Sequence, residues 1–161
     1  MRELYDLLLI VHSFTRWWVL VASAGALAYA LWAVRARNAS VPRDHWVGRV
    51  VVLSVDVQVL LGMTLYFEVS PLARAARELW AARGLLVLWQ ARELRFFGLI
   101  HPLLALSAAS VAHAGWVAVR RAQTRNQRQR SLALGAALSC LLFLLAIPWP
   151  FLGHERPWFR F

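Results

Sequence analysis

Long hydrophobic blocks, separated by short arginine-rich segments, make up most of this chain. A helix of ~20 mostly apolar residues crosses the bilayer core, and four blocks reach that length. We expect helices because lipid cannot satisfy the open edge of a sheet, and because the blocks are too long and too continuously apolar for barrel strands. The pattern predicts an all-α, four-helix transmembrane bundle. It forms a single membrane domain over residues 1–161, with spans at about 5–34, 46–67, 93–119 and 131–148.

The connections between the blocks predict the orientation of the bundle. Residues 35–45 hold three arginines and one acid, and residues 120–130 read RRAQTRNQRQR, with five arginines and no acid. Short loops rich in Arg stay on the cytoplasmic side, so both termini and the 68–92 connection are expected on the outer side. Within that connection, Ser70-Pro71 is a typical start for a short helix, and the run after it has basic and apolar faces suited to the membrane interface.

The composition agrees with a membrane protein. Hydrophobic residues make up 60% of the chain and charged residues 16%, whereas a soluble domain has roughly half and a quarter. The net charge of +10 would suggest nucleic-acid binding. The arginines, however, lie between apolar blocks, as membrane topology requires, so we expect a lipid bilayer and no nucleic acid. The lone Cys140 cannot form an intramolecular disulfide.

Two histidines inside the spans are matched in depth. Ionisable groups within a membrane are costly and point to function. His12 lies seven residues in from Tyr5, ~10 Å along a helix, and His101 lies eight residues in from Glu93, ~12 Å. Two imidazoles at one level on two helices can hold one iron, on the two faces of a haem. Copper or zinc usually needs a third or fourth ligand, and the sequence suggests no carboxylate, Cys or Met at that level.

Arginines and one acid are the other candidate cofactor-binding residues. Arg16 and Asp56 each lie eleven residues in from an outer end, ~16 Å, and we expect them to pair because pairing relieves the cost of burying either charge alone. Arg16 follows His12 by four positions and shares its helix face, so it could instead bind a haem propionate or a quinone carbonyl. Arg92 or Arg95 could meet the other propionate.

A second haem has weaker support. His113 follows His101 by twelve positions, which turns it ~120° around the helix and places it ~18 Å deeper. The same offset from His12 reaches Ala24, which cannot ligate a metal. His113 with His45 remains an alternative pair, although their levels match only roughly. We therefore expect one haem, between the first and third spans.

Four stretches carry a resemblance. The segments HSFTRW (12–17), DVQVLLGMTLYF (56–67), RFFGLIHP (95–102) and AIPWPF (146–151) resemble the short four-helix bacterial membrane proteins labelled cytochrome b-like. The resemblance implies that His12 and His101 are the motif histidines and that Arg16 and Asp56 are the motif charges. That family often carries an acid just before the third-span histidine, where this chain has Ile100.

These observations lead to an expected function. We expect a b-type haem electron-transfer protein in the bacterial inner membrane, linked to a quinone pool or to larger respiratory or photosynthetic subunits. The alternative is a haem-free structural subunit of a membrane complex, and a quinone-linked oxidoreductase is a third reading. Electron carriage alone is not turnover, so the sequence leaves open whether the protein is an enzyme.

Overall fold

The computed structural model describes residues 2–36, 44–153 and 157, and every regular element within them is helical. Residues 37–43, which include two of the arginines used to orient the bundle, and most of the tail after residue 153 lie outside the described residues. The elements are α1 (Arg2–Arg35), α2 (Asp44–Thr64), the π-helix η1 (Leu65–Val69), α3 (Pro71–Gln90), α4 (Arg92–Arg95), the π-helix η2 (Phe96–Ile100), α5 (His101–Arg121), α6 (Arg125–Ala146) and the short 3₁₀ turn η3 (Pro150–Leu152).

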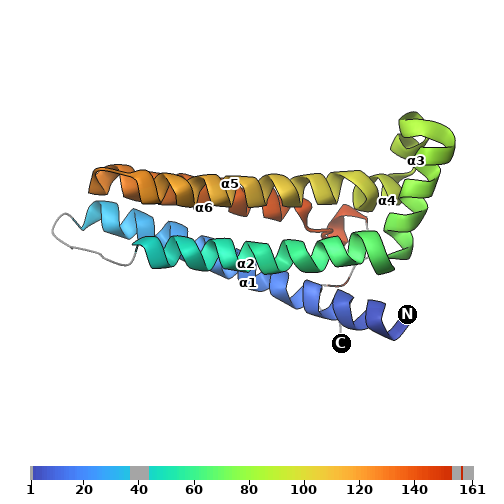
Figure 1. Ribbon diagram of the computed structural model, residues 1–161, viewed down its shortest axis with the longest axis horizontal. Helices are drawn as coiled ribbons and strands as arrows, with labels where there is room; N and C mark the ends of the chain where they lie inside the picture. Colours follow the sequence, from blue (N-terminus) through green and yellow to red (C-terminus); the bar gives the residue numbers. More distant parts are fainter. Residues whose placement is uncertain (1, 37–43, 154–156, 158–161) are drawn as a thin grey trace.

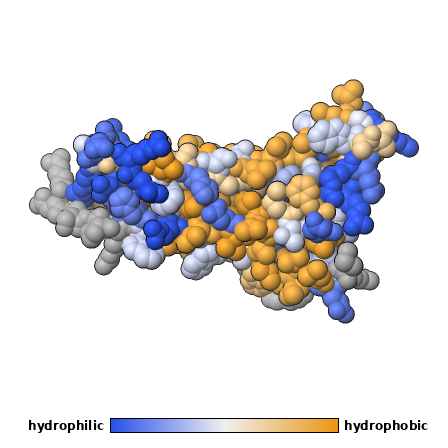
Figure 2. Space-filling view, in the orientation of Figure 1, coloured by the Kyte–Doolittle hydropathy of each residue, from blue (hydrophilic) through white to orange (hydrophobic). Residues whose placement is uncertain are grey.

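Four helical segments are long and apolar enough to cross a membrane, which confirms the predicted number of spans among the described residues. They are α1, α2 continued by η1, the run α4–η2–α5, and α6. The four lie side by side as a bundle (Figure 1). Figure 2 shows hydrophobic surface along the middle of the molecule, with hydrophilic residues gathered at the end where α5 meets α6 and near α3. This distribution suits a bilayer environment.

The last span begins and ends earlier than residues 131–148. Thr124 and Gln127 form a capping box, in which each side chain accepts from the other residue's backbone N–H, so α6 begins at Arg125 within the polar segment. At the other end α6 stops at Ala146, because Pro148 and Pro150 have no N–H to continue the helical ladder. The hydrophobic run therefore marks the membrane-embedded part of α6 rather than its first turn.

Close packing holds α5 against α6. A Cβ atom added to Gly135 would lie 2.9 Å from the Cα of Gly115, so only glycine fits at this crossing. Between the same helices the buried Ser139 hydroxyl donates to the carbonyl oxygen of Ala108 over 3.0 Å. Lipid provides little hydrophobic drive between helices, and small residues with interhelical hydrogen bonds replace it.

A buried carboxylate ties together the end of the bundle opposite α3. Asp44, the first residue of α2, is 2% exposed. Its Oδ1 accepts from the Tyr29 hydroxyl over 2.8 Å and from the Gln129 amide over 2.7 Å, and Arg128 lies 4.0 Å from Oδ2. The acid at the start of α2 also suits the positive end of the helix dipole. This network joins α1, α2 and α6.

The connection between the second and third spans is a helix of twenty residues, longer than the short helix that Ser70-Pro71 suggests. The Ser70 side chain accepts from the Ala73 N–H and starts α3, and Gly84, with φ at 81°, bends the helix midway. The first half of α3 packs on the bundle so tightly that a Cβ at Gly98 would lie 2.3 Å from the Cβ of Ala76. Figure 1 shows α3 crossing one end of the bundle at a steep angle to the spans.

Candidate functional site

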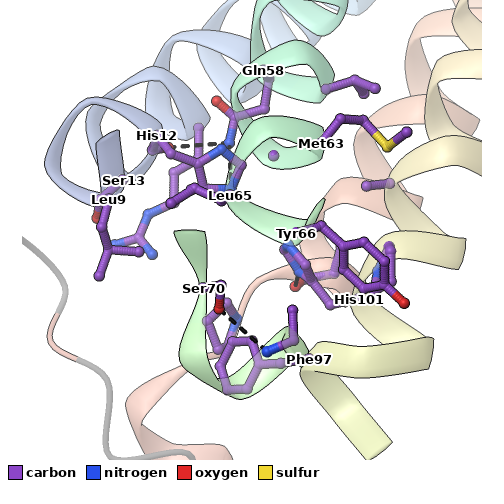
Figure 3. Close-up of a pocket in the computed structure, with 18 of the residues that line it drawn as sticks. Leu9, His12, Ser13, Gln58, Met63, Leu65, Tyr66, Ser70, Phe97 and His101 are labelled. Carbon is purple, nitrogen blue, oxygen red and sulfur yellow. Dashed lines mark hydrogen bonds between the residues drawn. The ribbon is translucent and has the colours of Figure 1, made fainter. Parts of the chain in front are cut away.

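His12 and His101 lie against each other inside the bundle, as their matched depths predict. Their ring centres are 6.1 Å apart and their planes meet at 76°. The two residues come from α1 and α5, which face each other across the bundle axis because each packs on both α2 and α6. The imidazoles therefore occupy the space between diagonal helices (Figure 3), beside the first turn of α3.

A local break in the third span positions His101. Pro102 lacks the N–H that would bond to the carbonyl oxygen of Gly98, and the backbone widens into the π-helix η2, with the His101 N–H donating to Phe96. The freed Gly98 carbonyl oxygen accepts from the Tyr66 hydroxyl over 2.9 Å. Single π-turns of this kind are frequent at functional sites because they re-aim a side chain.

The AIPWPF stretch supplies the hydrogen-bond partner of His101. Pro148 and Pro150 leave the carbonyl oxygens of Leu144 and Ala146 without their helical donors. The Trp149 indole N–H donates to Leu144 over 2.8 Å, and His101 Nδ1 lies 2.7 Å from the Ala146 oxygen. A carbonyl oxygen only accepts, so Nδ1 carries the proton and Nε2 of the neutral ring presents a lone pair. Metal-ligating histidines typically have this outer hydrogen bond.

A glutamine from α2 holds His12. The Gln58 amide nitrogen lies 3.3 Å from His12 Nε2 and donates to the His12 carbonyl oxygen over 3.1 Å (Figure 3). The Thr15 hydroxyl donates to the Gln58 side-chain oxygen, which sets the orientation of the amide. His12 Nδ1 is buried and has no hydrogen-bond partner among the described residues. The ring is thus anchored on one side and unsatisfied on the other.

The two imidazoles line a cavity of about 150 Å³. Its walls are mostly apolar and come from α1, α2, α3, α5 and α6. The side chain of Arg16 also lines it, as does the buried hydroxyl of Ser13, which has no hydrogen-bond partner among the described residues. Met63 is a further lining residue, which corrects the expectation that no Met lies at this level. The lining residues closest to the argument are His12, Ser13, Arg16, Gln58, Gly62, Met63, Ala73 and His101.

Gly62 makes room beside His12. A Cβ atom at this position would lie 3.2 Å from His12 Cε1 and 3.8 Å from its Nδ1. A larger side chain on α2 would therefore displace the imidazole or fill the cavity. Gly62 and Gln58 lie four residues apart and share one face of α2, which is the face that meets His12.

Asp56 does not pair with Arg16, contrary to the expectation from their equal depths. Its carboxylate lies 2.8 Å from His113 Nε2 on α5. Arg16 instead lines the cavity and donates to the carbonyl oxygen of Pro157 over 3.5 Å. Equal depth did not predict the pairing, because depth does not show the direction in which a side chain points. Asp56 projects from α2 toward α5, whereas Gln58, two positions along, projects toward α1. Asp56 is thus not part of the cavity lining.

The alternative pair of His45 and His113 is also wrong. His113 contacts Asp56, and His45 lies eleven residues from Asp56 on the same helix, ~16 Å away. The two imidazoles cannot share an iron at that separation.

The two arginines at the mouth of the third span point elsewhere. Arg95 donates to the Trp89 carbonyl oxygen over 2.6 Å and stacks on the Trp89 ring. The Arg92 guanidinium lies beside Gly153. Neither residue lines the cavity.

The site offers two imidazoles and little else that binds metal. No group of three or more His, Cys, Asp or Glu within the described part of the chain could hold a bare metal ion. A haem differs, because its porphyrin supplies four of the six ligands and the protein needs to supply only two. Sequence reasoning did not assign Gln58, Tyr66 or Ala146 to the site. Gln58 could have been suspected as an uncharged polar residue deep in an apolar span.

Comparison of the chain with family models, with curated proteins and with solved structures found no match.

Proposed function

We propose that this protein binds one haem b between His12 and His101 and carries single electrons within the bacterial inner membrane. The observation that carries the proposal is the contact of two imidazoles from diagonal spans across a largely apolar cavity, with ring centres 6.1 Å apart. Bound haem iron would cycle between its ferric and ferrous forms and so accept and release one electron. The protein's part is to hold, orient and shield that group.

The donor geometry fits a six-coordinate haem. Metal–imidazole bonds of about 2 Å place the centres of two opposed imidazoles roughly 6 Å apart, close to the observed separation. The hydrogen bond from His101 Nδ1 to Ala146 leaves Nε2 available as a ligand. His12 Nε2 accepts a hydrogen bond from the Gln58 amide, so this bond must break before Nε2 can bind iron. The Gln58 amide keeps its second hydrogen bond, to the His12 carbonyl oxygen.

The cavity accommodates a haem only in part. The cavity of about 150 Å³ is smaller than the roughly 300–1,000 Å³ of typical small-molecule sites, so loading a macrocycle must move lining side chains outward. Gly62 already presents no side chain to His12, and Ala73, Ala105 and Ala146 add little bulk. The apolar walls suit the faces of a porphyrin. Arg16 is the one arginine of this lining among the residues that the structure describes, and we assign it to a haem propionate.

The proposal includes an orientation. We propose that the arginine-rich α5–α6 connection faces the cytoplasm. The start of α3 lines the histidine cavity, and α3 lies at the opposite end of the bundle, so the cavity would then lie toward the outer side. A haem at that depth suits exchange of electrons with a quinol in the membrane and with an acceptor outside it, or with larger respiratory or photosynthetic subunits.

The proposal is tested on the protein expressed with an adequate haem supply and purified in mild detergent. We expect reduced-minus-oxidised bands of a six-coordinate b-type haem at one haem per chain. Retention of the 76° angle between the rings would give the oxidised protein a highly anisotropic low-spin EPR signal. A folded protein that stays colourless after haem is added would contradict the proposal and favour the haem-free structural subunit.

Replacing Arg16 by glutamine is expected to lower the midpoint potential of the haem. A positive charge beside the cofactor favours the reduced state, which carries one positive charge fewer. Its loss should lower the potential by roughly 30–60 mV, a three- to tenfold change for a one-electron couple. Redox titration with optical detection measures the shift. Arg95→Gln, outside the cavity, is the matched control, and equal shifts in both variants would count against the assignment of Arg16.

Replacing Gly62 by leucine is expected to prevent haem binding while the fold remains. The new side chain enters the space beside His12, where even a Cβ lies 3.2 Å from the ring. The haem-to-protein absorbance ratio after purification measures retention, and circular dichroism verifies the helices. Gly25→Leu provides the control, because nothing lies within 4 Å of a Cβ there. Full haem occupancy in Gly62→Leu would show that the cofactor binds elsewhere.

A further inference from the structure

A polar pair lies on the outside of the bundle, where α2 meets α5. His113 Nε2 donates to Asp56 Oδ1 over 2.8 Å, yet the two side chains remain 47% and 41% exposed. Asp56 is twelve residues from the start of α2, ~18 Å, and His113 is eight residues from the end of α5, ~12 Å. Both depths lie within the hydrocarbon core that these spans cross.

Such a pair is incomplete as a monomer in lipid. Ionisable groups inside a membrane almost always face other protein or a water-filled cavity. Within the described residues, Asp56 Oδ2 and His113 Nδ1 have no hydrogen-bond partner. In an ion pair both ring nitrogens of histidine carry protons, so Nδ1 is a donor, and the second carboxylate oxygen is an acceptor. One donor and one acceptor are left over on the same patch.

This patch is complementary to itself. A two-fold interface brings the same surface of two subunits together, so that each group meets the group it lacks. We infer that the α2–α5 face is the interface of a homodimer, in which His113 of each copy donates from Nδ1 to Asp56 of the other. The two carboxylates and two imidazoles then form a closed ring of hydrogen bonds, in which each imidazole bridges two carboxylates.

The shape of the same face agrees with this inference. The outward face of α5 combines small side chains with the exposed bulky residues Leu103, Leu106 and Val117, and the neighbouring outward positions of α2 carry bulky ones. Two-fold packing inserts the bulky ridge of one copy into the shallow trough of the other, and small residues let helix backbones approach closely. The trough consists of Ser107, Ser110, Ala114 and Ala118 and is bordered by Leu106 and Val117, and the ridge consists of Leu53, Val57 and Leu60.

A second copy satisfies this patch better than lipid. Acyl chains have no hydrogen-bonding groups, so they leave Oδ2 and Nδ1 unsatisfied. A different membrane protein would need an acid and a base placed at matching depths, whereas a second copy has both by symmetry. The inference stands independently of haem binding, because neither Asp56 nor His113 lines the histidine cavity.

Disulfide cross-linking in lipid vesicles tests the interface. The only native cysteine, Cys140, is replaced by serine, and Ser110→Cys is added on the proposed face. We expect oxidation to give a covalent dimer at protein-to-lipid ratios too low for random collision. Leu138→Cys on the exposed face of α6 serves as the matched control and should remain monomeric. Equal cross-linking at the two positions, or none at Ser110→Cys, would overturn the inference.

A second measurement tests the polar ring itself. Energy transfer between labelled copies in vesicles reports the dimer dissociation constant, which Asp56→Leu or His113→Leu should raise about tenfold or more. The double variant should cost little beyond either single change, because each alone already breaks the ring. Wild-type protein that is monomeric in vesicles, or variants that dimerise as tightly as wild type, would contradict the proposal. The visible spectrum is recorded in parallel, and we expect it to be unchanged.

Discussion

Replacing either His12 or His101 by alanine is expected to abolish the six-coordinate haem spectrum of the purified protein. The two rings meet on a cavity that, among the described residues, has no third His, Cys, Asp or Glu in its lining. Met63 is the one lining thioether among them, and a Met ligand would give a spectrum different from that of two histidines. His101→Ala also removes the hydrogen bond to Ala146. The visible spectrum and the haem-to-protein ratio after purification measure the effect, and added imidazole should partly restore six-coordinate bands.

The controls for this result are the other two described histidines. His113→Ala changes the Asp56 pair and His45→Ala an exposed position at the start of α2; both variants should retain the wild-type spectrum. The assignment of His12 as a haem ligand would be wrong if the His113→Ala variant lost its haem absorption bands while the His12→Ala variant retained them. Normal spectra in both His12→Ala and His101→Ala would place the haem outside this cavity.

Replacing Gly135 by leucine is expected to destabilise the bundle strongly, although this residue lies away from the site. A Cβ at this position meets the Gly115 backbone at 2.9 Å, and backbone cannot move aside as a flexible side chain does. Separating α5 from α6 also stretches the buried bond from Ser139 to Ala108. We expect a loss of about 3 kcal/mol in the free energy of unfolding, measured by denaturation in mixed micelles followed by circular dichroism.

Gly25→Leu is the matched control for this prediction too, because its Cβ meets open space. That variant should unfold within ~0.5 kcal/mol of wild type. A Gly135→Leu protein as stable as Gly25→Leu would mean that α5 and α6 do not pack through these two glycines.

The histidine site was accessible to sequence reasoning because a helix advances by a constant rise. Counting residues from span ends places His12 and His101 at nearly equal depth, and the structure brings their rings together. The four spans were predictable for a similar reason, since their length and apolar content are set by the bilayer.

Counting along an axis does not show which way a side chain points around it. Asp56 and Arg16 have equal depths, yet Asp56 turns toward α5 and binds His113. The α2 and α5 helices run antiparallel, and each side chain leans toward its own N-terminus. The carboxylate and the imidazole therefore lean toward each other and meet, although their backbone positions differ in level. Such pairings depend on the rotation of each helix within the bundle.

The backbone breaks near His101 were only partly predictable. Pro102 and the AIPWPF stretch indicate missing helical bonds. The tertiary fold decides which donors replace the missing backbone N–H groups. The Tyr66 hydroxyl donates to the Gly98 carbonyl oxygen, and His101 Nδ1 donates to the Ala146 carbonyl oxygen. Sequence alone shows that these oxygens need partners, while only the fold shows that one partner is the proposed ligand itself.

The optical spectrum of the wild-type protein tests the central claim most directly. The protein is purified after expression with sufficient haem supply, and spectra are recorded before and after reduction with dithionite. Sharp bands of a low-spin, six-coordinate b-type haem at one haem per chain are the predicted result. A helical, monodisperse preparation that has no such bands and takes up no added haem would show that His12 and His101 meet without holding an iron.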